Sequence, residues 1–582
     1  MICLAATSTA GFDRLEIEAS LDCESRSISG ITRVRLGSIG SELQDLRFRL
    51  YPNRFCDDSD TASCGVVVDS ILVDDRNLSE RIVVDGTDLT LMLPESVPAS
   101  DTLSIELYFT TVVPEKRGRF GFYDGQFTLE GWFPIPAPWR DTGWLKVDYG
   151  QNAEPVADLY DITATIQLPD TLQVIAGGIQ ETDTLEGTQV VKLALCPAQD
   201  LPLIAATGYK RDDTNCGGII VTTYYTPNQA FALDTVRHTV CRTLQYMSDN
   251  VMVYPFKELI VVMGGQKGSG AVELPRMVLM SERESGFFTR IYQATLIHEV
   301  IHQWFFGALN SDQANEPWLD ESITEYFTER VNRWMVGDGA DFISLFGFTA
   351  GFAGVHRMIS HSFIDLVPID RPAANYAHQE YYGTVYCKGA MVLKTMTAIM
   401  GKERERQFWR EYTDRFLFSR PTPSGFVEIA TRYMPTDDTA AVSALISTVA
   451  SLDFAIRSVA VEQLDDTTDS AGDSSGIAQD FRITVEYTAR QPLGFPVDFR
   501  IEYSDGSVQD TVLDPAPGTH RLTFRCDEVP VCVMIDPEYK YAIDMNLINN
   551  SYQLARCRGA GLRLFSGVMF LVESLFSMLW GI

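Results

Sequence analysis

The residues whose types and spacing could do chemistry lie first in the segment His298-Glu299-Val300-Ile301-His302. Apolar residues around it recur at three- and four-residue steps, which predicts a helix with both imidazoles one turn apart on the same face. Two histidines so placed can reach a single ion, and Glu299 on the adjacent face can contact a water molecule bound to it. The chain has only seven histidines, so we interpret this spacing as a metal site and not as two histidines of an ordinary core helix.

A third ligand is expected from the next helix. Four glutamates lie within reach in the sequence: Glu316, Glu321, Glu325 and Glu329. Eighteen residues separate His302 from Glu321, enough to finish one helix and turn back. Two histidines, one glutamate and a water make an open, catalytic zinc site. Glu325, one turn beyond Glu321, is placed to accept a hydrogen bond from a liganding imidazole, although a solvated acid on a helix face is an equal interpretation.

Three motifs in order connect the chain with a family. The run HEVIHQWFFGALNSDQANEPWLDESITEYFTE has HExxH, eighteen residues and then glutamate in a WL-x-E-x-x-x-x-Y context. Gly270-Ala271-Val272-Glu273-Leu274 precedes it, and Tyr386-Cys387-Lys388-Gly389-Ala390 follows it. Together these resemble the signature, the GAMEN motif and the Y-x-K-G-A segment of the zinc aminopeptidases of the aminopeptidase N and leukotriene-hydrolase type. The resemblance covers about residues 12–550 and is nearest to the shorter bacterial members of these gluzincin metallopeptidases.

The resemblance assigns roles to the metal ligands and their neighbours. It implies one Zn²⁺ ion held by His298, His302 and Glu321. Glu299 would take a proton from the attacking water and return it to the leaving amine. Tyr386 would donate its phenolic proton to the oxyanion.

The resemblance also assigns substrate-binding residues. Glu273, together with Gly270 and Ala271, would bind the free N-terminus of a peptide, because a carboxylate in a closed pocket recognises an ammonium group by charge-assisted hydrogen bonds. Tyr381 matches a second tyrosine of the family's site. Aromatic packing is the other interpretation of both tyrosines.

The motifs depart from the family at one residue. Where the family has Met-Glu-Asn, this chain has Val272-Glu273-Leu274, so amine recognition is either looser or completed by another side chain. The family also uses a Glu or Gln from its N-terminal sheet, for which Glu130 and Gln126 are the nearest matches.

These residues predict a zinc-dependent aminopeptidase that acts on peptides with a free N-terminus. The same site would suit a zinc endopeptidase or an epoxide hydrolase, and the Leu274 departure keeps that alternative open. A non-catalytic, membrane-associated scaffold with a zincin fold is a further alternative. Glu299 and Tyr386 argue against a scaffold, which would need neither side chain.

The pattern along the 582 residues predicts a multidomain α+β protein. Short alternating runs over 1–209 predict an N-terminal antiparallel β-sandwich or saddle. Residues 210–452 are mainly helical and form, by the resemblance, a thermolysin-like zinc peptidase domain. Alternation returns over 453–548, which predicts a small C-terminal β-sandwich. The tail 549–582 is expected to carry an amphipathic or membrane-associated helix.

Charge and the tail bear on partners. The chain has 47 Lys+Arg against 78 Asp+Glu, a net charge of −31, which excludes nucleic acid as a partner because phosphates repel such a surface. Residues 562–582 are apolar apart from Arg563, Glu573 and three serines. They fit a helix that lies in a membrane interface, or that covers a groove on a protein, better than a membrane-spanning segment.

Cysteines leave the compartment open. Of the eleven cysteines, Cys56 with Cys64 and Cys526 with Cys532 are close in sequence, and each pair is either a disulfide or two free buried thiols. The cell envelope or another extracytoplasmic location is favoured over the cytoplasm.

Overall fold

The computed structural model describes residues 12–554 apart from short gaps. The gaps are 38–41, 57–63, 99–100, 141–142, 150–151, 153, 267–269, 283–288, 338–340, 346–347, 362–366, 436, 448–451, 465–479, 491–493 and 515. The chain forms two compact units, each described by itself. The first comprises Met1–Gly351, Asp370–Tyr381 and Phe408–Phe426, and the second comprises Phe352–Ile369, Tyr382–Gln407 and Val427–Ile582.

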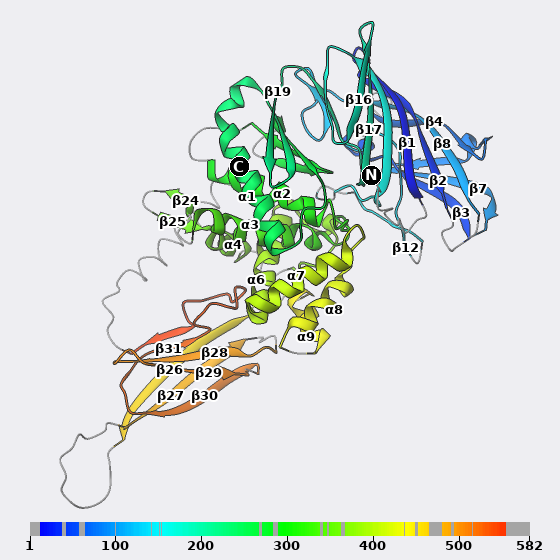
Figure 1. The fold of residues 1–582 in the computed structure, drawn as a ribbon. Coiled ribbons are helices and arrows are strands. Elements are labelled where there is room, and N and C mark those ends of the chain that lie inside the picture. Colours follow the sequence, from blue (N-terminus) through cyan, green and yellow to red (C-terminus); the bar gives the residue numbers. More distant parts are fainter. Residues whose placement is uncertain are drawn as a thin grey trace, which may run out of the picture. The chain divides into compact units, whose positions relative to one another are not determined.

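The first unit begins with β-sheets, drawn in blue to cyan in Figure 1. Burial alternates along their strands, as in Leu103–Val112, so one face of each strand packs on a core. The largest sheet has the order β16 (Ile179–Leu185), β17 (Thr188–Ala198), β14 (Tyr160–Pro169), β1 (Phe12–Asp22), β2 (Ser27–Leu36), β8 (Leu103–Val112), β4 (Gly65–Val73) and β5 (Arg76–Asn77). The β1–β14 pair is parallel, so the predicted all-antiparallel arrangement is wrong at that point.

Smaller sheets accompany the large one. One has the order β11 (Ile135–Pro136), β3 (Leu43–Arg49), β7 (Asp88–Val97) and β6 (Ile82–Asp85). A second has the order β15 (Gln173–Ile175), β18 (Leu203–Ala206), β10 (Gln126–Leu129) and β9 (Phe120–Tyr123). A third consists of the pair β12 (Trp139–Arg140) and β13 (Gly143–Trp144). One hydrophobic core includes Leu15 and Leu107 of the large sheet with Phe48 and Leu91 of a smaller one. The sheets therefore pack on each other around a shared interior.

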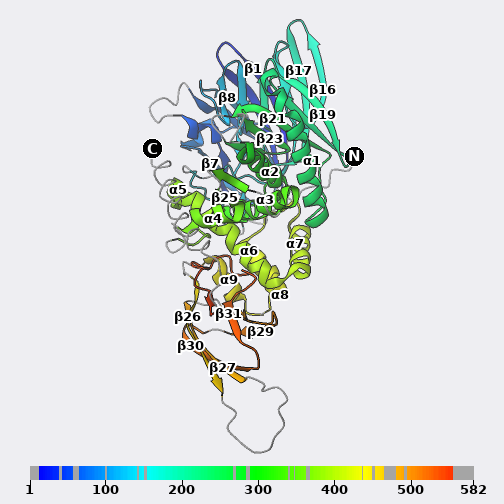
Figure 2. The ribbon, with the colours of Figure 1, turned by 90° about the vertical axis from the view of Figure 1, so that its left-hand side faces the viewer.

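The helical part of the first unit is built on a mixed sheet. Its order is β19 (Lys210–Cys216), β20 (Ile219–Tyr225), β21 (Glu258–Gln266), β23 (Met277–Ser281) and β22 (Ala271–Leu274). Its helices are α1 (Leu233–Asn250), α2 (Thr289–Phe305), α3 (Glu321–Val336) and the short α5 (His378–Tyr381), with the pair β24 (Asp341–Leu345) and β25 (Phe348–Gly351) beside them. Helix α2 packs on both α3 and the edge strand β22, and Figure 2 shows α2 between the sheet and α3.

The second unit combines helices with a C-terminal β-domain. Its helical elements are α4 (Phe352–His361), a π-helical turn (Tyr382–Lys388), α6 (Gly389–Met400) and α9 (Thr439–Ser447), while α7 (Lys402–Phe416) and α8 (Pro423–Tyr433) are shared with the first unit. The β-domain contains one sheet of β26 (Asp453–Leu464), β27 (Asp480–Arg490) and β30 (Gly518–Cys526), and another of β29 (Val508–Leu513), β28 (Val497–Tyr503), β31 (Pro530–Ile535) and β32 (Ser551–Gln553). Phe499 and Phe524 stack across the two sheets at 5.4 Å.

The predicted order of a β-rich N-terminal part, a helical middle and a small C-terminal β-domain is confirmed. The expected apolar helix of the 549–582 tail falls mostly on residues outside the described part of the chain. Among the described helices, none combines the length and the apolar character needed to cross a membrane.

Of the two cysteine pairs that are close in sequence, one forms a disulfide and the other does not. Cys56 and Cys64 form a disulfide, but Cys526 and Cys532 are free thiols. Cys526 lies on β30 and Cys532 on β31, and these two strands belong to different sheets. A disulfide that the sequence reasoning missed, Cys216–Cys241, joins β19 to α1.

Candidate active site

Helices α2 and α3 bring the predicted metal ligands together. Helix α2 is buried along its C-terminal half, with Ile297, Val300 and Ile301 fully buried, so it lies inside the unit and carries His298 and His302 with it. A short 3₁₀ turn, Pro317–Leu319, reverses the chain, and α3 begins directly at its first ligand candidate.

Three side-chain atoms converge on one point. Glu321 Oε2 lies 3.1 Å from His298 Nε2 and 3.3 Å from His302 Nε2, and the two imidazole nitrogens are 3.0 Å apart. Ligands about 2.0–2.1 Å from a tetrahedral zinc ion lie about 3.3 Å from each other. Two nitrogens and one carboxylate oxygen at this spacing therefore fit Zn²⁺. All three residues are buried, with no more than 9% of their surface exposed.

A carboxylate lies against the other ring nitrogen, Nδ1, of each of these two imidazoles. Glu325 Oε2 lies 2.7 Å from His298 Nδ1, and Asp320 Oδ1 lies 2.7 Å from His302 Nδ1. Such contacts fix the tautomer and the orientation of an imidazole so that Nε2 faces the ion. The sequence pointed to Glu325 but missed Asp320, although its place directly before Glu321 at the start of α3 was a usable signal.

The electrostatics of this cluster favour a bound cation. Burial lowers the pKa of His298, but the carboxylates of Glu321 and Glu325 outweigh it and raise the pKa to about 10. Burial raises the pKa of Glu321, yet the two imidazoles lower it overall to well below its usual value. The carboxylates thus stabilise positive charge at the convergence point, which a metal ion supplies when it replaces the imidazole protons.

Two further carboxylates lie beside the metal ligands. Oxygen atoms of Glu299 and Glu273 and a ring nitrogen of His302 all lie within 4.8 Å of one another. Glu299 Oε2 is buried and has no hydrogen-bond partner within the described residues. Burial raises the pKa of Glu299 to about 7 against the opposing charge of His298 and His302.

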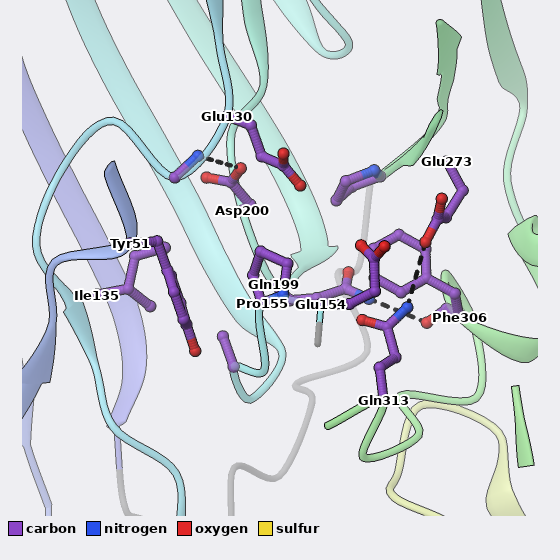
Figure 3. Close-up of a pocket in the computed structure, with 13 residues that line it drawn as sticks. Tyr51, Glu130, Ile135, Glu154, Pro155, Gln199, Asp200, Glu273, Phe306 and Gln313 are labelled. Carbon is purple, nitrogen blue, oxygen red and sulfur yellow. Dashed lines mark hydrogen bonds between the residues drawn. The ribbon is translucent and has the colours of Figure 1, made fainter. Parts of the chain in front are cut away.

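Glu273 lies on the edge strand β22 and opens onto a cavity, shown in Figure 3. The lining of this cavity includes the acids Glu130, Glu154, Asp200 and Glu273. Arg119 lies 2.7 Å from Glu130 and 2.5 Å from Glu154, so one half-buried guanidinium faces two of these acids.

The remaining predicted residues are distributed as follows. Gly270 is exposed and Ala271 half-buried at the start of β22. Tyr381, at the end of α5, is buried; burial raises its pKa well above its usual value, and the nearby charge of Glu321 adds to the effect. Tyr386 lies in the π-helical turn of the second unit, so its role stays a prediction.

Other sequence candidates make contacts away from the metal ligands. Gln126 accepts a hydrogen bond from Tyr209 at 2.7 Å, and Glu329 pairs with Arg333 at 3.0 Å. Burial raises the pKa of Glu316 to about 7, with the charge of Asp312 adding to it. None of these carboxylates belongs to a group that could hold a metal ion among the described residues.

Comparison with known proteins identifies the helical part. Residues 236–447 match the Peptidase family M1 domain. Leucine aminopeptidase 2 of Phaeosphaeria nodorum is 22% identical over 395 residues, covering 61% of this chain and 60% of that protein. Probable aminopeptidase 2 of Sulfurisphaera tokodaii is 23% identical over 206 residues, covering 34% of this chain and 25% of that protein. Such matches span between a fifth and three fifths of the curated relatives' length.

Solved structures share the fold. Legionella pneumophila aminopeptidase A in complex with aspartic acid superposes with a TM-score of 0.66 at 13% identity, covering 92% of this chain and 60% of that one. The M1 zinc metallopeptidase from Deinococcus radiodurans gives 0.55 at 15% identity, covering 76% of this chain and 97% of that one. The helical part of the chain thus matches the Peptidase family M1 domain over residues 236–447, and the chain shares its fold with these solved peptidase structures.

Proposed function

We propose that the protein is a zinc-dependent aminopeptidase that removes the N-terminal residue from peptides. One observation carries the proposal: the carboxylate of Glu273 lies within 4.8 Å of Glu299 and of a nitrogen of the metal-ligand imidazole His302. An ammonium group held by Glu273 would therefore lie about one residue from the metal point. That spacing leaves room for a single amino acid before the scissile bond, which favours an exopeptidase over an endopeptidase.

The residues divide the work as follows. His298, His302 and Glu321 would hold Zn²⁺, whose Lewis acidity makes water nucleophilic at neutral pH and polarises a carbonyl. Glu273 would bind and orient the substrate's ammonium group. Glu299 would accept a proton at Oε2, the buried oxygen without a hydrogen-bond partner, and pass it to the leaving amine. Asp320 and Glu325 would keep the imidazoles in position.

The role that we propose for Tyr386 rests on its sequence motif. Its place in the Y-x-K-G-A segment supports a role as the donor to the oxyanion, where one hydrogen bond stabilises the transition state by roughly 3 kcal/mol. Gly270 and Ala271, at the exposed start of β22, would bind the backbone of the substrate.

A panel of aminoacyl-naphthylamides tests this function. The protein should hydrolyse substrates with a free α-amine and lose that activity on treatment with a chelator, with recovery on adding Zn²⁺. The N-acetylated form of the best substrate should be inert, since Glu273 would have no ammonium group to bind. Equal rates on free and acetylated substrates would instead support the endopeptidase alternative.

We also propose peripheral membrane contact through residues 562–582. The support is their apolar sequence, interrupted by Glu573. Binding to vesicles that disappears on deletion of residues 559–582, with activity retained, is the expected result. Equal vesicle binding by the full and the truncated chain would contradict it.

A further inference from the structure

Gln313 contacts both functional halves of the site. It lies in the segment between α2 and α3 and is 3% exposed. Its Nε2 atom donates to Asp320 Oδ2 at 2.6 Å and to Glu273 Oε1 at 3.4 Å. Figure 3 shows the second of these contacts, with the amide of Gln313 directed at the carboxylate of Glu273.

The two acceptors serve different tasks. Asp320 uses its other oxygen, Oδ1, to hold Nδ1 of His302 at 2.7 Å. Glu273 extends from the edge strand β22 towards the cavity. An amide nitrogen carries two hydrogens, so one side chain can donate to both carboxylates at once, and bonds to ionised acceptors are stronger than bonds between neutral groups.

The chemistry of the contact suits a neutral amide. Asp320 and Glu273 are both acids and more than nine-tenths buried. A neutral amide can donate a hydrogen bond to both without neutralising either charge. Asp320 can then still bind the imidazole of His302, and Glu273 can still bind the ammonium group of the substrate. The residue after Glu273 is Leu274, whose side chain has no hydrogen-bond donor. An amide from a distant segment of the chain therefore takes over the support of the Glu273 carboxylate.

We propose that Gln313 is a positioning residue that ties the amine-binding carboxylate of Glu273 to the Asp320–His302 arm of the metal site. This inference rests on the proposed function, because it takes Glu273 as the group that binds the substrate's ammonium. Recognition of a peptide N-terminus and retention of the metal ion then depend on the same side chain.

Two affinities, measured without turnover, test the bridge. Calorimetry on the zinc-loaded protein gives the Kd of 3-methylbutylamine, which presents an ammonium group and has no bond to cleave. Competition with a chromophoric chelator gives the Kd of the metal-free protein for Zn²⁺. In Gln313→Ala, both Kd values should rise, each by about tenfold, because Glu273 and Asp320 each lose the hydrogen bond that the amide of Gln313 donates to hold the carboxyl group in place.

Single-arm variants and a matched control separate the bridge from general damage. Glu273→Ala should weaken amine binding alone, and Asp320→Ala should weaken Zn²⁺ binding alone. Gln189 is a buried amide outside the cavity that Glu273 lines, and its Nε2 atom also makes two contacts, donating to Pro169 O at 3.0 Å and to Leu172 O at 2.6 Å. Gln189→Ala should lower the melting temperature about as much as Gln313→Ala does but leave both affinities unchanged.

Three results decide the matter. A rise of both Kd values in Gln313→Ala, above those of Gln189→Ala, supports the bridge. A rise in only one of them, or in neither, overturns it. Wild-type protein that fails to hydrolyse any aminoacyl-naphthylamide would contradict the proposed function instead, since neither affinity depends on turnover.

Discussion

At the scale of single residues, the site consists of three groups of side chains at different distances from the point where the metal ion would bind. His298, His302 and Glu321 converge, and Glu325 and Asp320 lie behind the two imidazoles at 2.7 Å. Glu299 and Glu273 are left with oxygens near the convergence point. A buried carboxylate costs free energy unless a cation or a proton neutralises its charge. All these acids are buried, and each lies next to an imidazole or near the point where the metal ion would bind.

Glu299 is the residue whose removal should separate binding from chemistry. We expect Glu299→Gln to keep its zinc but to lower kcat by at least about a hundredfold, because the amide cannot accept a proton from water. Steady-state kinetics with metal analysis of the same sample checks this. A fully active Glu299→Gln variant would refute the assigned role.

Glu325 is expected to affect the metal and not the chemistry directly. In Glu325→Gln the imidazole of His298 loses a charged acceptor, and Zn²⁺ affinity should fall by about tenfold or more. Glu329→Gln is the matched control, since Glu329 lies one turn further along α3 and pairs with Arg333. Chelator competition on both proteins gives the comparison; equal affinities would show that Glu325 does not support the metal.

The sequence could predict residues that act through local spacing. His298, Glu299, His302 and Glu321 follow from helix periodicity and a fixed interval, and the structure brings their side chains together. Gln313 was out of reach because its two acceptors come from a strand 40 residues before it and from a turn 7 residues after it. Such contacts depend on how the segments fold back, which no motif encodes.

At the scale of elements, alternation and helical periodicity were enough to place strands and helices in the right parts of the chain. Pairing between elements was harder to predict. The parallel neighbours β1 and β14 are more than 130 residues apart, and β30 and β31 follow each other in the chain but join different sheets. Sheet order depends on long-range packing, so closeness in sequence could not decide between a disulfide and two thiols for Cys526 and Cys532, and the structure shows no disulfide between them.

The Cys216–Cys241 disulfide should stabilise the first unit. It closes a loop with a sequence separation of 25, and loss of such a crosslink costs about 3 kcal/mol through the entropy of the unfolded chain. Denaturant unfolding of the double variant Cys216→Ser, Cys241→Ser should show this loss. Cys526→Ser, which removes a free thiol, should change stability far less; equal effects would mean that the crosslink is absent in solution.

Asp544 should make the stability of the second unit depend on pH. Burial raises its pKa to about 6, although Asn550 and two backbone amides oppose the shift. A raised pKa in the folded state means that folding takes up a proton, so the contribution is complete below the unfolded pKa and is lost as pH rises through about 6. Between pH 5 and pH 8 the unfolding free energy should fall by about 1 kcal/mol from this group.

The variant Asp544→Asn removes the titrating group and keeps the shape of the side chain. Its unfolding free energy, measured with denaturant at several pH values, should lack this part of the decline. A decline of the same size in the variant and the wild type would contradict the assignment to Asp544.

At the scale of the whole molecule, the match to peptidase family M1 covers residues 236–447, and the fold extends well beyond it, over 92% of the chain in one comparison. The β-rich flanks supply part of the site: Arg119, Glu130 and Glu154 line or approach the cavity next to Glu273. The net charge of −31 is consistent with attraction of cationic peptides over long range.

The central claim is that one zinc ion is held jointly by His298, His302 and Glu321, and metal content tests it most directly. Purified wild-type protein, saturated with Zn²⁺ and desalted, should contain one zinc per chain, and Glu321→Ala and His302→Ala should contain far less while keeping the circular dichroism of the wild type. Zinc retained at one per chain in either folded variant would contradict the claim.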